Sequence, residues 1–221
     1  MPSAATPEGL AFLRELAQNN NREWFTAQKN RFEHDLREPL LAFVEALAPR
    51  IGAIDPSVAC DAKSVFRIYR DTRFAKDKSP YKTNLGAHFT PRQPGKGRDE
   101  TVHLPGYYLH IEPGGCFFGA GTWRPDGPSL ARIRGAMEAQ PAAWTRARDA
   151  AAPLGGEQLQ RVPKGYAADH PLADDLRRKD FVAMRQYEET MLCREDFLDD
   201  FVADCARVLP MVQFLARAVG A

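Results

Sequence analysis

The residues best suited to chemistry in this sequence gather between Phe66 and Lys82. Guanidinium groups bind a phosphate or a carboxylate through paired hydrogen bonds, and a lysine ammonium adds a compact positive charge. The block therefore predicts a site for a ligand that carries one of these anionic groups. Its candidate ligand-binding residues are Arg67, Arg70, Arg73, Lys78, Tyr81 and Lys82. Asp71, in the middle of the block, is a candidate acid or base.

Alternation of apolar and polar residues over positions 64–74 indicates a half-buried strand. Phe66 and Ile68 would then face the core. The residues on the opposite face would be Arg67, Tyr69, Asp71 and Arg73. A surface cluster of charges is often structural, however. The arginines could equally pair with acidic residues of the C-terminal third and bind no ligand, and the sequence leaves both alternatives open.

A second group of reactive residues lies on a predicted hairpin. Two aromatic-rich runs flank a Glu-Pro-Gly-Gly turn, and they span residues 102–111 and 116–123. With this turn, Tyr108 faces Gly119 and His110 faces Phe117. A histidine with its ordinary pKa of about 6.5 can carry a proton near neutral pH, so His110 is a candidate acid or base. Tyr108 and Trp123 join the ligand-binding candidates, although a lone sheet histidine could equally be a packing residue.

Metal and cofactor sites have little support in the spacing of ligand residues. The five histidines form no HxH or HExxH motif, and the four cysteines form no CxxC pair. The sequence also lacks the glycine-rich loops that hold nucleotide phosphates and the GxSxG motif of serine hydrolases. We therefore expect no metal, no cofactor and no disulfide framework.

The overall charge is almost balanced, with 30 lysines and arginines against 29 aspartates and glutamates. A net charge of +1 excludes a uniformly basic nucleic-acid-binding protein and an acidic tail. The charges are nevertheless unevenly distributed. Residues 63–98 carry ten bases and two acids, whereas residues 169–205 carry five bases and eleven acids. The two stretches could pair within one chain or between copies of it.

Helices are predicted at both ends of the chain. Residues 7–18 show helical spacing of leucines, and Asn20 with Glu23 has the form of a capping box that opens a longer helix, kinked at Pro39. Together they would form an N-terminal helical hairpin. Apolar residues at spacings of three and four over positions 197–219 indicate a C-terminal helix.

The middle of the chain is predicted to contain the sheet. Besides the hairpin, the pattern indicates a strand at 85–90, an edge strand at 181–187, and helices at 129–139, 142–151 and 171–178. This order favours an α+β fold, a single domain over residues 1–221 with a mixed or antiparallel central sheet. The Pro/Gly/Arg stretch at 91–98 is typical of a mobile loop.

The sequence also bears on location. It has no run of about 18 apolar residues, and its N-terminus lacks a positively charged segment followed by an apolar one. We therefore expect a cytoplasmic protein without a membrane partner. The sequence does not determine the oligomeric state.

Several of these motifs occur together in one known family. They are Asn-Asn-Arg-Glu-Trp-Phe at 20–25, the block at 66–82, Gly-Tyr-Tyr at 106–108 and Gly-Ala-Gly-x-Trp at 119–123. In these motifs the chain resembles the bacterial and fungal family catalogued as domain of unknown function 2461, over about residues 8–219. The resemblance implies a single-domain protein. It carries no assigned activity, so it identifies no site residue.

The sequence thus leads to three hypotheses. The first is a small phosphate- or carboxylate-bearing ligand bound at a basic sheet face. If that site is catalytic, Asp71 or His110 would act as the acid or base and the arginines would stabilise negative charge. The second, which we favour less, is nucleic acid bound by the same basic and aromatic face. The third is an interaction protein without a ligand. Whether the protein is an enzyme stays open.

Overall fold

The computed structural model of the chain describes residues 1–91 and 103–221. At its centre is a five-stranded antiparallel sheet with the strand order β1-β2-β3-β5-β4. The strands are β1 (Leu85–Phe89), β2 (Gly106–Ile111), β3 (Phe117–Thr122), β4 (Leu154–Gly155) and β5 (Phe181–Gln186). These elements confirm the α+β class. The loop expected at 91–98 lies, from residue 92 onward, outside the described residues.

One strand has a different position from the one its sequence predicts. β5 is a strand, as expected, but it does not form the edge of the sheet. The two residues of β4 pair with Val182 and Ala183 on its outer side. A two-residue strand offers too little alternation to be recognised in a sequence, so the prediction of an edge strand is wrong.

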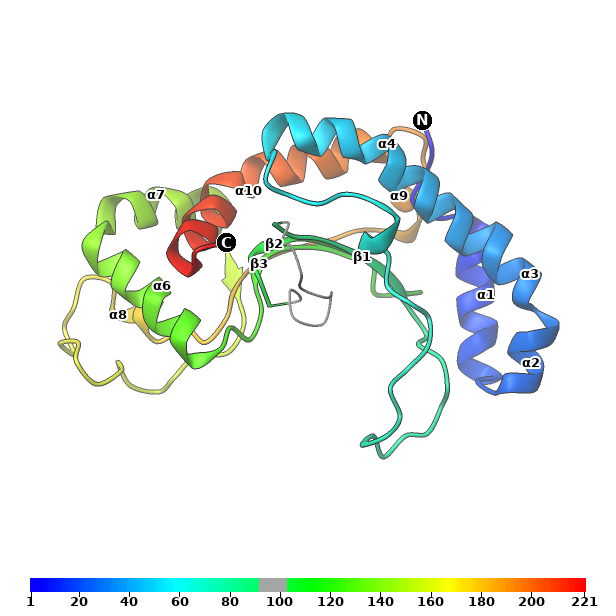
Figure 1. Cartoon of the computed structure of the whole chain (residues 1–221), viewed down its shortest axis with the longest axis horizontal. Helices are drawn as coiled ribbons and strands as arrows, with labels where there is room; N and C mark the ends of the chain where they lie inside the picture. The colour runs from blue at the N-terminus through cyan, green and yellow to red at the C-terminus, as the bar shows by residue number, and fades with distance from the viewer. Residues whose placement is uncertain (92–102) are drawn as a thin grey trace.

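Two long helices, α4 (Glu38–Ile54) and α10 (Phe197–Val219), lie over one face of the sheet (Figure 1). The strand residues on this face, such as Leu109 and Phe118, are fully buried. Phe201 of α10 contacts Phe118 edge-on, with 5.4 Å between the ring centroids. Burial of such large apolar side chains is the main favourable contribution to folding. The apolar side of each strand therefore faces these helices, and its other side faces away from them.

The N-terminal helices form the expected hairpin beside the sheet (Figure 1). α1 (Pro7–Gln18) begins at Thr6, whose hydroxyl accepts a hydrogen bond from the Gly9 amide at 2.9 Å. The second arm of the hairpin is not one regular helix. It consists of α2 (Arg22–Ala27), α3 (Lys29–Arg31), the π-helical turn η1 (Phe32–Arg37) and α4.

Two details of this hairpin differ from the prediction. The side chain that caps α2 belongs to Asn21, which accepts from the Trp24 amide at 2.9 Å, and not to Asn20. The irregular turn η1 precedes Pro39, which itself lies in the first turn of α4. Pro39 has no N–H to donate to the carbonyl of Asp35, and the Thr6 hydroxyl donates to that carbonyl at 2.5 Å. The irregularity thus coincides with a contact to the start of α1.

Helices form within each of the segments predicted at 129–139, 142–151 and 171–178, whereas the short helix α9 (Glu189–Leu192) is not among the predicted elements. α6 (Gly127–Ala139), α7 (Pro141–Ala151) and α8 (Ala173–Leu176) lie at the opposite end of the sheet from α1, and α9 precedes α10 (Figure 1). Among the described residues, no helix is both long enough and apolar enough to cross a bilayer.

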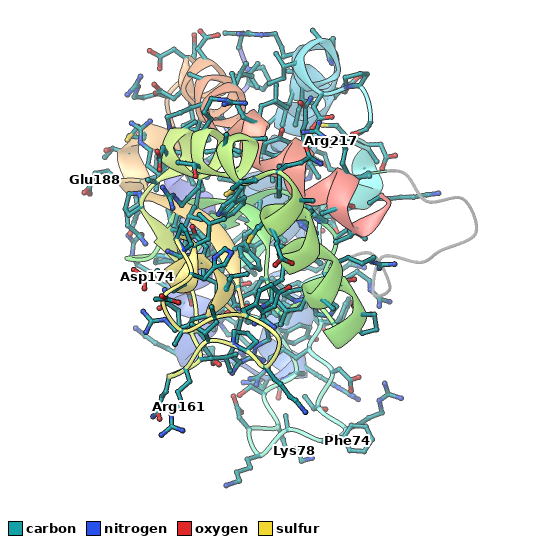
Figure 2. All side chains as sticks on the ribbon, turned by 90° about the vertical axis from the view of Figure 1, so that its left-hand side faces the viewer. Phe74, Lys78, Arg161, Asp174, Glu188 and Arg217 are labelled. Carbon is teal, nitrogen blue, oxygen red and sulfur yellow. The ribbon has the colours of Figure 1, made fainter. Side chains whose placement is uncertain are left out.

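A protruding segment replaces the strand predicted at 64–74. After the short 3₁₀ helix η2 (Ala62–Ser64), the chain makes only isolated bridges, between Val65 and Ala87 and between Tyr69 and Tyr81. We call residues 68–82 the finger. Its stalk is 68–70 paired with 80–82, and its tip is 71–79. The finger extends away from the helices and the sheet (Figure 1). Phe74 and Lys78 lie at its far end (Figure 2).

The strand prediction for 64–74 is wrong, and beyond Arg70 the reason is that side chains bind the local backbone. Asp71 Oδ1 accepts from the Arg73 amide at 3.1 Å, and Asp77 Oδ1 accepts from the Ser79 amide at 2.9 Å. Turns of this kind bend the chain and compete with strand pairing. Asp71 and Arg73 are therefore not part of the extended segment that holds the preceding residues.

Candidate functional site

The hairpin register places two predicted residues on the sheet face that points away from α10. Tyr108 pairs with Gly119 and His110 pairs with Phe117, as the sequence predicts. On the other side of β2, His110 pairs with Gly86 of β1. Cα partners in an antiparallel sheet point to the same face, so the glycines leave room beside the phenol and the imidazole.

Three titratable side chains of β2 and the following turn form a hydrogen-bonded chain on this face. The Tyr108 hydroxyl lies 2.8 Å from Nδ1 of His110, and Nε2 of His110 lies 3.1 Å from Oε2 of Glu112. The His110 side chain is 12% exposed and that of Glu112 is 39% exposed. Thr83 donates to the other Glu112 oxygen at 3.3 Å. The chain thus runs from a buried phenol to a carboxylate that solvent can reach.

The Tyr108 hydroxyl retains its proton at one end of this chain. Burial, and secondly the charge of Glu112, raise the pKa of Tyr108 to about 12. The phenol therefore keeps its proton at neutral pH and can donate it to Nδ1 of His110. In the tautomer that carries its proton on Nε2, the imidazole accepts from Tyr108 and donates to Glu112. This arrangement allows the imidazole to exchange a proton with either neighbour.

Glu112 is the one member of this chain that the sequence analysis does not identify as functional. It was assigned only to the turn of the hairpin. Tyr108, His110 and Glu112 follow one another at intervals of two residues. All three side chains therefore lie on one face if the backbone stays extended as far as Glu112. The spacing Tyr-x-His-x-Glu is the signal that could have found it.

Close packing holds the chain in place. The His110 ring stacks on Phe117, with 4.6 Å between centroids and 21° between the planes. A Cβ at residue 86 would lie 2.6 Å from the Tyr108 hydroxyl, so the phenol rests directly on Gly86. Both rings are therefore held in one orientation, as an acid–base group requires.

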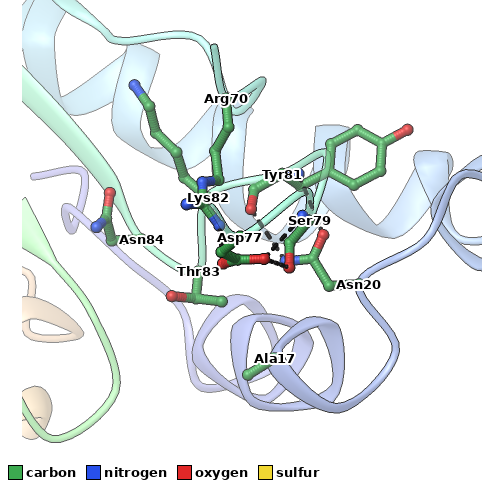
Figure 3. Close-up of a pocket in the computed structure, with 9 residues that line it drawn as sticks. All are labelled: Ala17, Asn20, Arg70, Asp77, Ser79, Tyr81, Lys82, Thr83 and Asn84. Carbon is green, nitrogen blue, oxygen red and sulfur yellow. Dashed lines mark hydrogen bonds and ion pairs between the residues drawn. The ribbon is translucent and has the colours of Figure 1, made fainter. Parts of the chain in front are cut away.

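A polar cavity of about 350 Å³ lies at the base of the finger (Figure 3). It is lined by Ala17, Asn20, Arg70, Asp77, Ser79, Tyr81, Lys82, Thr83 and Asn84. Three of the predicted ligand-binding residues, Arg70, Tyr81 and Lys82, are among them. Thr83 links this cavity to the Tyr108–His110–Glu112 chain, because it lines the cavity and its hydroxyl donates to Glu112.

The three predicted residues play different parts in the cavity. Arg70 forms an ion pair with Asp77, which also accepts from the Ser79 hydroxyl at 2.5 Å. The Ser79 hydrogen bond, followed by that of Arg70, holds the pKa of Asp77 well below its usual range. Lys82 Nζ lies 5.2 Å from the ring centroid of Phe66. The Tyr81 ring points away from the cavity and stacks on Phe25 at 4.0 Å, so it serves packing (Figure 3).

The other predicted residues lie outside the cavity. Both oxygens of Asp71 are bound by Arg73, which lowers the pKa of Asp71 to about 2. The Lys78 ammonium donates to the Thr72 carbonyl at 2.9 Å. Arg67 is exposed and makes no ion pair with any residue that the structure describes. The geometry therefore favours His110 over Asp71 as an acid or base.

Trp123 lies apart from these groups. It follows β3 at the end remote from the turn of the hairpin, and the Arg124 guanidinium lies 4.6 Å from the centroid of its ring. The indole is half-exposed but does not line the cavity.

The basic and acidic stretches of the sequence do not neutralise each other through the ion pairs of the described residues. Arg70 and Arg73 pair with acids of their own finger, Asp77 and Asp71. The acids of the C-terminal third pair elsewhere. These pairs include Glu189 with Arg14, Asp199 with Arg50, Asp200 with Arg194, and Asp204 with Arg185. Among the described residues, the ion pairs of Arg70 and Arg73 therefore lie within the finger and do not join it to the acidic C-terminal third.

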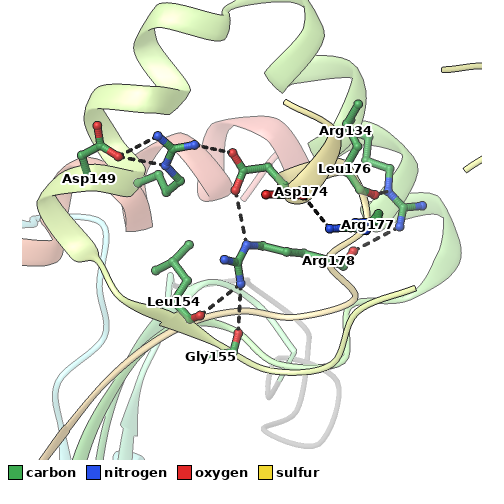
Figure 4. Close-up of polar contacts among 10 residues, drawn as sticks. Arg134, Asp149, Leu154, Gly155, Asp174, Leu176, Arg177 and Arg178 are labelled. Atoms are coloured by element: carbon green, nitrogen blue, oxygen red, sulfur yellow. Dashed lines mark hydrogen bonds and ion pairs between the residues drawn. The ribbon is translucent and has the colours of Figure 1, made fainter. Parts of the chain in front are cut away.

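A second cluster of arginines, around α8, is structural (Figure 4). The buried Asp175 accepts from Arg148 at 2.7 Å and from Arg178 at 3.3 Å. Arg178 also donates to the carbonyl of Leu154 in β4, and Arg134 donates to the carbonyl of Arg178. These bonds join α6, α7, α8 and β4. In the part of the chain that the structure describes, no group of three or more metal-ligating residues could hold an ion.

Comparison with known proteins agrees with the motifs quoted from the sequence. The family model described as "Conserved hypothetical protein (DUF2461)" matches residues 8–214. The chain therefore belongs to this family. No curated protein and no solved structure matches it.

Proposed function

We propose that this member of the DUF2461 family binds a small ligand with a phosphate or carboxylate group in the cavity at the base of the finger. The observation that carries the proposal is that two cations, Arg70 and Lys82, line a polar cavity that holds one carboxylate, Asp77. A guanidinium and an ammonium are the usual partners of such anionic groups.

The dimensions of the cavity suit a small molecule. A volume of about 350 Å³ is near the lower end of known ligand pockets, which span roughly 300–1,000 Å³. The polar atoms around it come from several separate parts of the chain, including the turn after α1 and the end of the finger. Such a wall can orient a ligand through hydrogen bonds as well as through charge.

The Tyr108–His110–Glu112 chain adds a proton acceptor to the neighbourhood of the ligand. Glu112 is its solvent-exposed end and accepts a hydrogen bond from Thr83, a residue of the cavity wall. We propose His110, acting through Glu112, as the acid–base group of this site. We assign no reaction, because the ligand is defined only by its anionic group.

We also place the protein in the cytoplasm. None of the four cysteines forms a disulfide, and three of them, Cys60, Cys116 and Cys205, are buried. Proteins of the reducing cytoplasm usually keep their cysteines reduced.

The test is calorimetric titration of the full-length protein with inorganic phosphate and with citrate at pH 7. Lys82→Gln should weaken binding by about tenfold, which corresponds to one lost charge-assisted hydrogen bond. Lys164→Gln removes the same charge from an exposed loop outside the cavity and should leave binding unchanged. Equal affinities in the wild type and Lys82→Gln, or no binding of either anion, would overturn the proposal.

A further inference from the structure

The finger presents two aromatic rings to solvent. Phe74 is 95% exposed and Tyr69, on the stalk, is 58% exposed. Figure 2 shows Phe74 at the far end of the finger, near Lys78 and away from the rest of the chain. Neither ring lines the cavity. Both are therefore available for a partner that the cavity does not bind.

Positive charge surrounds these rings. From residue 67 to residue 78 the chain carries five cations and two carboxylates. The exposed cations are Arg67, Arg73, Lys76 and Lys78. Arg67 and Lys76 make no ion pair with any described residue. The guanidinium of Arg73 lies 5.9 Å from the centroid of the Phe74 ring.

The finger is also held in one shape before any partner binds. Two backbone hydrogen bonds join its stalk, from Arg70 to Pro80 at 3.0 Å and from Lys82 to Ile68 at 2.7 Å. Bonds within the tip, such as that of Lys78 to the Thr72 carbonyl, fix the loop. A preorganised surface loses less conformational entropy on binding than a flexible one.

We infer that the finger binds single-stranded nucleic acid, with bases stacked on Phe74 and Tyr69 and phosphates bound by the surrounding cations. Exposed bases stack on aromatic side chains, and lysines and arginines follow the backbone. A duplex hides its base faces, so exposed rings on the finger favour a single strand. A lipid surface fits less well, because Phe74 is the only large apolar side chain at the tip, between polar and charged residues.

The first test is binding of a fluorescein-labelled 20-nucleotide oligothymidylate to the full-length protein at low salt, followed by anisotropy. Phe74→Ala should weaken binding by about tenfold, as expected for the loss of one stacked base. Trp123→Ala is the matched control, because Trp123 is also an exposed ring beside an arginine but lies outside the finger. An equal loss in both variants, or no loss in Phe74→Ala, would overturn the assignment to the finger.

Salt dependence tests the role of the cations. If three or four of them contact phosphates, the logarithm of the association constant should fall with the logarithm of salt concentration with a slope of about −2 to −3. Lys76→Gln should make this slope less steep by about 0.7. A slope near zero would contradict phosphate contacts by the finger.

A spectroscopic variant separates nucleic acid from lipid. Phe74→Trp places an indole at the tip. Stacking of a base on this indole should make the oligonucleotide quench tryptophan fluorescence more strongly in the variant than in the wild type. A blue shift with vesicles of phosphatidylglycerol and phosphatidylcholine, together with no response to the oligonucleotide, would overturn the inference in favour of a membrane surface. Phe74→Ala should leave titration with inorganic phosphate unchanged, so the finger and the cavity are tested separately.

Discussion

The side-chain amide of Asn20 binds both polar groups of the Tyr81 backbone. Its Oδ1 accepts from the Tyr81 amide at 3.1 Å, and its Nδ2 donates to the Tyr81 carbonyl at 2.9 Å. The Tyr81 ring stacks on Phe25 of α2. Two motifs about sixty residues apart thus meet at the base of the finger, and Asn20 positions the peptide that leads into Lys82 and the cavity.

Asn20→Ala should lower the free energy of unfolding by about 1–3 kcal/mol, because it leaves two part-buried backbone groups without partners. Urea denaturation at neutral pH measures the change. Asn30→Ala is the matched control, since Asn30 is an exposed amide on α3. An equal and small effect of both substitutions would show that the Asn20 bonds do not contribute to stability.

Asp77→Asn should strengthen the binding of inorganic phosphate, on the order of tenfold, because Asp77 competes with the ligand for Arg70. Asparagine keeps an acceptor for the Ser79 amide, so the turn is preserved. Asp71→Asn removes the same charge from the same finger, but Asp71 binds Arg73 and lies outside the cavity. Calorimetric titration of both variants should show the gain in Asp77→Asn alone, and weaker binding in that variant would contradict a role for Arg70.

Tyr108 should make stability fall at alkaline pH. Its pKa is raised to about 12 by burial, whereas an unfolded tyrosine titrates at about 10. Between these values the unfolded chain has lost a proton that the folded chain retains, so the free energy of unfolding decreases as pH rises. The contribution of Tyr108 to the free energy of unfolding is complete below pH about 10 and is lost as the pH approaches 12. Tyr108→Phe should reduce this slope by about 1.4 kcal/mol per pH unit.

Urea denaturation across this range measures both slopes. Tyr107 and Tyr187 also have raised pKa values because they are buried, and they contribute equally in the wild type and in the variant. Identical slopes in the two proteins would show that Tyr108 titrates as it does in the unfolded chain.

The hairpin could be predicted from the sequence because its information is local. Alternation fixes which residues share a face, and the Glu-Pro-Gly-Gly turn fixes the register that brings Tyr108 opposite Gly119. The finger could not be predicted in the same way. Asp71 and Asp77 bind the backbone two residues on, and those hydrogen bonds override an alternation that otherwise resembles a strand.

The cavity depends on long-range contacts that no local pattern contains. Ala17 and Asn20 come from the N-terminal hairpin, and Lys82 and Asn84 follow the finger. The capping-box pattern at Asn20 was misleading, because Asn21 provides the cap and leaves Asn20 free to bind Tyr81. A polar residue beside a helix start can serve either purpose, and only the tertiary structure decides between them.

Gly86→Ala should disrupt the Tyr108–His110–Glu112 chain. The added Cβ would lie 2.6 Å from the Tyr108 hydroxyl and 2.9 Å from the Leu109 carbonyl oxygen, so the phenol must move away from His110. We expect a loss of about 1–3 kcal/mol in urea denaturation, as is typical of overpacking. Gly119→Ala, on the same face, meets its nearest atom at 3.7 Å, so it should be tolerated. The two variants add the same methyl group on either side of Tyr108. Equal free energies of unfolding would therefore show that the contact between the phenol and Gly86 does not contribute to stability.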